Sequence, residues 1–155
     1  MEKVLIAIDY NPTSEVVAQK GYQLAKTLGA EICLMHVVAD VSYYGMQYPT
    51  FMGFDGYEVP FNPNIYGELR DVAANYLTTA AKHFNDAGVQ THIAEGETAD
   101  AILNYAQEWG ASILVMGTHS HGTLEKLLMG TVASRVIEHT KIPVHLIPTQ
   151  VEKSV

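Results

Sequence analysis

Two glycine-containing clusters in the last third of the chain carry residue types that hold anions. The first reads MGTHSHG and runs from Met116 to Gly122, and the second is Gly130-Thr131, directly before a segment with helical periodicity. Glycine lets a backbone approach a ligand closely, and the N–H groups at a helix start attract negative charge. The two clusters together predict a site for an anionic ligand.

Each candidate residue also has an ordinary structural interpretation. Gly117 lets a strand turn, Thr131 caps a helix N-terminus, and Asp9 caps the first helix with the polar residues that follow it. Taken singly, these structural interpretations are the more frequent ones. A ligand site is favoured only if the residues converge at one place in the fold.

The elements that must position these residues begin with five short apolar runs, which predict β-strands. Four runs are apolar almost throughout, as strands buried on both faces of a parallel sheet are, whereas VQTHI alternates as an edge strand does. The five runs are VLIAI (4–8), ICLMHVV (32–38), VQTHI (89–93), ILVM (113–116) and VHLI (144–147).

Segments with helical periodicity separate the runs and predict four helices. Gly29, Gly88 and Gly110 end the first three and predict left-handed C-terminal caps, while Pro143 ends the fourth. Strict alternation of strand and helix predicts an α/β class: a doubly wound five-stranded parallel sheet of order 3-2-1-4-5 with helices on both faces.

That strand order brings the candidate residues together. The order reverses between the first and fourth strands, and ligands of such sheets bind outside the carboxyl ends of the strands at the reversal. Asp9 and Gly117 are the residues that leave these two strands. The early carboxylate and the glycine cluster are therefore expected at one crevice.

Composition limits the kind of ligand and partner. The 155 residues are 48% hydrophobic and 17% charged, which suits one compact domain spanning 1–155. A net charge of −8 disfavours nucleic acid and anionic membranes as partners, and no apolar run is long enough to span a membrane. The single cysteine, Cys33, and an N-terminus that reads as a strand rather than a signal peptide predict a cytoplasmic protein.

The C-terminal region resembles the universal stress protein family. The stretch MGTHSHGTLEKLLMGTVASRVIEHTKIPVHLIP is similar to its signature, which in ATP-binding members reads Gly, two residues, Gly, nine residues, Gly, then Ser or Thr. Gly117 and Gly130-Thr131 match with the spacing intact, but Ser120 stands in place of the middle glycine. The resemblance covers nearly the whole chain and implies a Rossmann-like fold of the adenine nucleotide alpha hydrolase type.

This resemblance also implies roles for individual residues. Asp9 is expected to accept hydrogen bonds from ribose, Val37 to offer its backbone to the adenine edge, and Ala7 to form a small wall under the base. In the phosphate region, Gly117, His119 and Ser120 would line one side, and the start of the fourth helix would offer N–H groups. The full set of further nucleotide contacts that the resemblance implies is Met116, Gly117, His119, Ser120, His121, Gly130, Thr131 and Val132.

Ser120 leaves two outcomes open. If its position requires a positive φ, a side chain there costs on the order of 1 kcal/mol and tilts the loop away from the phosphates. If it does not, the serine hydroxyl adds a donor. We favour the second outcome, because Ser120 is small and Gly122 follows to absorb a turn.

Catalytic motifs are missing from the sequence. It has no Walker-type GxxxxGK, and Asp9 has no acidic neighbour. His119, His121, Cys33 and His36 do not make a convincing set of three or four metal ligands, so no metal site from protein alone is predicted. We expect ATP, accompanied by Mg²⁺ or Mn²⁺, to be held with slow or negligible turnover, so the protein is not predicted to be an enzyme; a slow ATPase is a weaker alternative.

An insertion at about 39–65 departs from the usual short connections of α/β units. It is rich in tyrosine and phenylalanine, so it is expected to pack on its own domain, on the nucleotide as a lid, or on a partner. If the phosphate site is closed, the alternative function is a dimeric interaction module that uses this insertion.

The last strand, Val144 to Ile147, predicts an exposed apolar edge that would be satisfied by pairing across a two-fold axis. Universal stress proteins typically dimerise through this strand, so the resemblance also implies a homodimer.

Overall fold

The computed structural model describes residues 1–39, 65–119 and 129–149. Within these ranges strands and helices alternate strictly, as the sequence predicted. The order is β1 (Lys3–Ala7), α1 (Ser14–Leu28), β2 (Glu31–Val38), α3 (Ile65–His83), β3 (Val89–Glu95), α4 (Thr98–Trp109), β4 (Ile113–Gly117), α5 (Thr131–His139) and β5 (Val144–Ile147).

All strand pairs of the sheet are parallel, and their order is β3-β2-β1-β4-β5. This confirms the predicted fold class and strand order. The alternating strand VQTHI belongs to β3 at one edge, and the strand VHLI is β5 at the other. The reversal of strand order therefore lies between β1 and β4.

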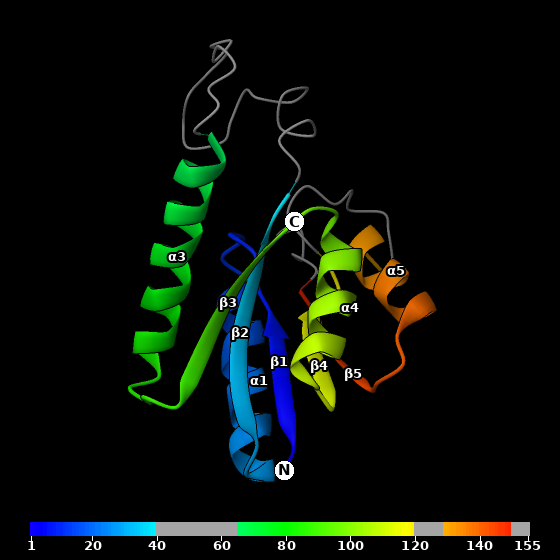
Figure 1. Ribbon diagram of the computed structural model, residues 1–155. Helices are drawn as coiled ribbons and strands as arrows, with labels where there is room; N and C mark the ends of the chain where they lie inside the picture. The colour runs from blue at the N-terminus through cyan, green and yellow to red at the C-terminus, as the bar shows by residue number, and fades with distance from the viewer. Residues whose placement is uncertain (40–64, 120–128, 150–155) are drawn as a thin grey trace, which may run out of the picture.

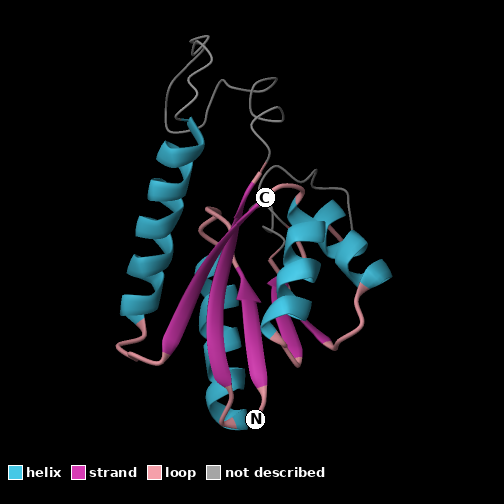
Figure 2. Ribbon diagram, in the orientation of Figure 1, coloured by secondary structure: helices cyan, strands magenta, loops and turns pink. Residues whose placement is uncertain are grey.

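Helices cover both faces of the sheet, with α4 and α5 in front and α1 behind it in the view of Figure 1. Figure 2 shows the same layers by secondary structure. Side chains alternate between the two faces along each central strand. In β1, Leu5 packs in a core beneath α4 and α5, whereas Val4 and Ile6 pack in a second core beneath α1 and α3.

Two of the predicted helix caps are confirmed and one is wrong. Gly29 and Gly110 follow α1 and α4 with φ of 65° and 80°, the left-handed conformation that glycine adopts without strain. Gly88 does not have a positive φ; after α3 the left-handed residue is Asn85, with φ of 50°. Asparagine tolerates this conformation better than other residues with a side chain.

The ends of α5 also differ from expectation. Its N-cap is Gly130, and Thr131 is the first helical residue, so Thr131 is not the N-cap. The helix ends at His139 with an extended Thr140 as C-cap, before Pro143 could interrupt it. The Thr140 hydroxyl donates to the Ile142 carbonyl at 2.8 Å, which fixes the turn into β5.

Of the predicted aromatic insertion, positions 40–64 lie outside the described residues. No helix in the described part of the chain is long and apolar enough to cross a membrane.

Candidate functional site

β1 and β4 are neighbours in the sheet, with Ile6 aligned to Val115. One residue further along the same register, Ala7 lies beside Met116 at the carboxyl ends of both strands. The chain segments that leave here begin with Ile8-Asp9 and with Gly117-Thr118. The predicted convergence of these two segments at the reversal is therefore observed (Figure 1).

Four of the implied nucleotide contacts lie on the α4 and α5 side of the sheet. Val37 and Met116 are buried members of the core there, 8% and 4% exposed, and Ala7 and Val132 pack against that core. The structure thus brings these four residues together. The side chains of Val37 and Met116 are both engaged in packing, so a contact from Val37 would have to come through its backbone, as expected.

Asp9 is half-buried and shapes the turn before α1. Its Oδ1 atom accepts the Asn11 N–H and the Ser14 hydroxyl, each at 2.8 Å. The N-cap of α1 is Thr13, whose side chain makes no capping bond. Asp9 therefore organises the loop but is not the N-cap of α1. The interpretation of Asp9 as a helix-capping residue is only partly correct.

Aromatic side chains surround this loop. The rings of Tyr10 and His36 lie 4.3 Å apart, and those of Tyr10 and Tyr76 lie 5.0 Å apart. His36 is buried, and its Nδ1 lies 2.9 Å from the Ile8 carbonyl. Because a carbonyl only accepts, Nδ1 carries the proton. Burial lowers the pKa of His36, which favours this neutral imidazole.

Where phosphate contacts were expected, the chain leaving β4 is held by Thr149, which follows β5. The Thr149 hydroxyl accepts the His119 N–H at 2.9 Å and donates to the His119 carbonyl at 3.0 Å. The Thr149 N–H donates to Thr118 Oγ1 at 3.0 Å, and Thr118 Oγ1 also lies 2.9 Å from His119 Nδ1. Thr149 is 7% exposed, so these hydrogen bonds are largely shielded from water.

Gly130 is fixed to the same segment. Its N–H donates to the Thr118 carbonyl at 2.7 Å, so the start of α5 is held against the exit of β4. The resemblance implied that the Gly130 N–H contacts a phosphate, but this N–H is used in a hydrogen bond within the protein. The N–H groups of Thr131 and Val132 belong to the first turn of α5, where N–H groups have no acceptor inside the helix.

Charge distinguishes α5 from the other helices of the described ranges. The first turns of α1, α3 and α4 contain Glu15, Glu68 and Asp100, and Glu97 also caps α4 by accepting the N–H groups of Ala99 and Asp100. The first turn of α5 has no acidic residue, and Gly130 has no side chain with which to cap it. The positive end of the α5 dipole is thus not neutralised by a carboxylate of its own first turn.

Ser120 and His121 lie outside the described residues, so the two outcomes for Ser120 both stay predictions. Among the residues that the structure does describe, no three His, Cys, Asp or Glu side chains gather as metal ligands. Cys33 is buried, and desolvation raises its thiol pKa to about 11, as for an unreactive core residue.

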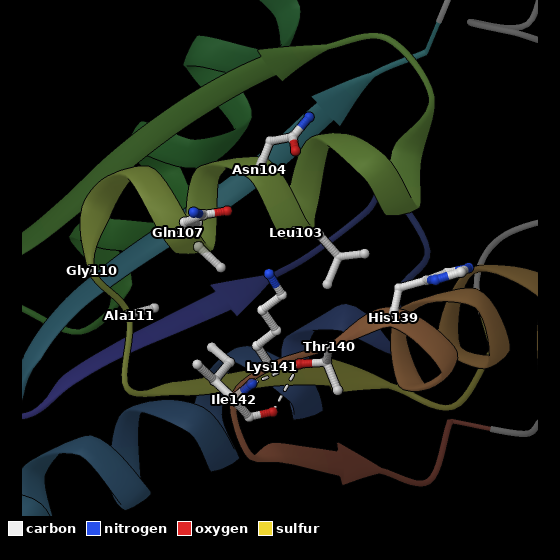
Figure 3. Close-up of a pocket in the computed structure, with 10 residues that line it drawn as sticks. Leu103, Asn104, Gln107, Gly110, Ala111, His139, Thr140, Lys141 and Ile142 are labelled. Atoms are coloured by element: carbon white, nitrogen blue, oxygen red, sulfur yellow. Dashed lines mark hydrogen bonds between the residues drawn. The ribbon is translucent and has the colours of Figure 1, made fainter.

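A cavity of about 450 Å³ lies at the opposite end of the sheet, between α4 and α5 (Figure 3). Both helices end at this cavity, and helix C-termini carry partial negative charge that disfavours phosphate. Lys141, which points toward α4, offsets that charge. Its position at the amino ends of the strands separates this cavity from the candidate site at the carboxyl ends of β1 and β4.

Both a family model and a curated relative match nearly the whole chain. The family model for the universal stress protein family matches residues 1–148. Universal stress protein YxiE of Bacillus subtilis is 30% identical over 154 residues, covering 94% of this chain and 97% of that protein.

Solved structures show the same fold. The structure of MJ0577 from Methanocaldococcus jannaschii superposes with a TM-score of 0.77 at 23% identity, covering 97% of this chain and 98% of that one. A universal stress protein of Archaeoglobus fulgidus in complex with dAMP gives a TM-score of 0.60 at 19% identity, covering 95% and 98% of the two chains.

Proposed function

Because this chain belongs to the universal stress protein family, we propose that it binds ATP at the carboxyl ends of β1 and β4 and holds it with little or no turnover. Mg²⁺ or Mn²⁺ would enter with the nucleotide and shield its phosphates. The related protein that holds dAMP supports an adenine nucleotide as the ligand class.

The observation that carries the proposal is the start of α5. Its first turn has no acidic residue, and the hydrogen bond from Gly130 to Thr118 holds it beside the exit of β4. Helix N–H groups and the helix dipole together favour phosphate at such a position. In a protein of net charge −8, local dipoles of this kind are needed to offset the general repulsion of an anion.

The opposite end of the ligand would lie near Asp9. The half-buried Asp9 carboxylate follows β1. In the sheet, β1 lies next to β4, and the chain leaving β4 leads to the proposed phosphate contacts. Carboxylate oxygens accept hydrogen bonds from hydroxyl groups, so Asp9 suits ribose. Ala7 and Val37, on the face beneath α4 and α5, would border the base.

Low turnover is proposed on chemical grounds. Phosphoryl transfer requires positioned cations and an oriented nucleophile in addition to a phosphate cradle. The candidate site supplies the N–H groups at the start of α5 and one carboxylate, Asp9, that is hydrogen-bonded within its own loop. The bound nucleotide would then act as a signal. The protein would form a homodimer through β5, and other proteins that bind this dimer would read the signal.

A charge introduced at the start of α5 tests the phosphate contact. Thr131 is exposed, so Thr131→Asp should leave folding intact and even favour the helix dipole. The new carboxylate would repel the phosphates, and we expect the affinity for ATP with Mg²⁺, measured by calorimetry, to fall by at least about tenfold.

Thr98→Asp is the matched control, because Thr98 is likewise the first residue of a helix, α4. It should leave the ATP affinity unchanged. Wild-type protein that binds no ATP, or a Thr131→Asp variant that binds as tightly as wild type, would contradict the proposed phosphate site.

A further inference from the structure

Asp9 is held at three separate points. Its N–H donates to Ser14 Oγ at 3.0 Å, its Oδ1 accepts the Ser14 hydroxyl at 2.8 Å, and its carbonyl accepts the Tyr76 hydroxyl at 2.5 Å. The Asn11 N–H donates to the same Oδ1 atom. Main chain and side chain of Asp9 are thus fixed together.

Besides the Asn11 N–H of the loop itself, the groups that hold Asp9 come from two helices on one face of the sheet. Ser14 is the first residue of α1 and is 5% exposed, while Tyr76 lies within α3 and is half-buried. Asp9 itself follows β1. Its position therefore depends on the packing of α1 and α3 against the sheet rather than on the loop alone.

The chemistry of these donors suits a positioning role. Burial, followed by the charges of Asp9 and Glu15, raises the pKa of Tyr76, so its hydroxyl stays protonated and can donate. Two donors fix Oδ1, and this sets the rotation of the carboxylate and the direction of its second oxygen. A carboxylate that is oriented in advance loses less freedom when a ligand binds.

We propose that Tyr76 and Ser14 are positioning residues that orient Asp9, and that they thereby set how strongly the site prefers a nucleotide with ribose hydroxyls over one without them. This inference rests on the proposed function. Ser14 lies on α1 and Tyr76 on α3, so neither belongs to the glycine signature in the last third of the chain.

Removing one hydroxyl tests the inference. In Tyr76→Phe the bond to the Asp9 carbonyl is lost while the ring contacts with Tyr10 remain possible. Calorimetry with ATP and with 2′,3′-dideoxy-ATP, both with Mg²⁺, gives the ratio of the two dissociation constants. We expect the preference for ATP to fall about three- to tenfold, with the dideoxy affinity unchanged.

Tyr22→Phe is the matched control, because it also removes a tyrosine hydroxyl bond, to Asp86, on the same face of the sheet. It should leave both affinities unchanged. Ser14→Ala is the second variant and should lower the same ratio; it keeps the test decisive if Tyr76→Phe unfolds, as thermal melting would show.

The outcomes separate the inference from the proposed function. Folded variants that keep the wild-type ratio, or that lose affinity equally for both nucleotides, overturn the positioning role while ATP binding stands. A wild-type protein that binds both nucleotides equally also overturns it, since Asp9 then does not read the sugar. A wild-type protein that binds neither nucleotide overturns the inference together with the proposed function.

Discussion

Gly117 is the residue at which packing and the proposed ligand site meet. A Cβ atom built there would lie 2.7 Å from Thr149 Cγ2 and 2.9 Å from Thr149 Oγ1. Thr149 is buried and bonded to the segment after β4, so it has little room to withdraw. Glycine is required here for the close approach of Thr149 rather than for a special backbone angle.

Gly117→Ala should therefore destabilise the protein. The added methyl group must displace Thr149 or the strand, and overpacking of this kind typically costs about 1–3 kcal/mol. The free energy of unfolding, measured with urea, should fall by this amount.

Gly67→Ala is its control, because a Cβ at exposed Gly67 in α3 meets no atom within 4 Å. That variant should be neutral or gain up to about 1 kcal/mol from the better helix propensity of alanine. Equal stability of Gly117→Ala and wild type would show that Thr149 does not pack against this position.

The roles of individual residues were predictable from the sequence only where the residues belong to a local motif. The spacing of Gly117 and Gly130-Thr131 was visible, and so was Asp9 at the end of an apolar run. Tyr76 was visible only as one member of a helical apolar stripe, and its hydroxyl bond to Asp9 joins positions 67 residues apart. No local pattern encodes such a contact, because it depends on how α3 packs.

At the scale of elements, the central strands β1, β2 and β4 were predictable because burial on both faces leaves continuous apolar runs, and the edge strand β3 was predictable from its alternation. Boundaries were less predictable. The strand predicted at 89–93 continues to Glu95, and the left-handed turn after α3 uses Asn85 instead of Gly88. The longer strand depends on its neighbour, since the Gly96 N–H donates to the Val38 carbonyl at 3.1 Å, whereas the turn at Asn85 is held by a local bond from its N–H to the Lys82 carbonyl.

β5 is the element on which assembly is proposed to depend. The Pro143 and Ile147 carbonyls accept hydrogen bonds from the β4 side. Because backbone direction alternates along a strand, the N–H and C=O groups of Val144 and Leu146 point to the sheet edge. These groups and the apolar side chains of β5 suit antiparallel pairing with a second copy.

His145→Glu tests this pairing. His145 is exposed in the middle of β5, so a dimer about a two-fold axis would bring the two new carboxylates close together. We expect wild-type protein to be a dimer by light scattering at micromolar concentration, and the variant to dissociate more readily.

The same change at exposed His83, at the end of α3, should have no effect on mass. Wild-type protein that is monomeric, or a His145→Glu dimer as tight as wild type, would contradict assembly through β5.

At the scale of the whole molecule, the sheet topology brings the segments of the candidate site together. The order β3-β2-β1-β4-β5 makes the segments that carry Asp9 and Gly117 leave neighbouring strands at one edge, although 108 positions separate the two residues in the sequence, and it places the start of α5 at the same edge. That convergence was predictable because parallel α/β units follow strict connection rules. The roles of α1, α3 and Thr149 in holding the two segments were not, since they arise from tertiary packing.

The most direct test of the account is to purify the protein without added nucleotide, denature it, and identify the released small molecules by mass spectrometry. We predict that ATP is released, at close to one molecule per chain. Release of no nucleotide, together with no binding of added ATP and Mg²⁺ by calorimetry, would contradict it and would leave the glycines of both clusters with structural roles alone.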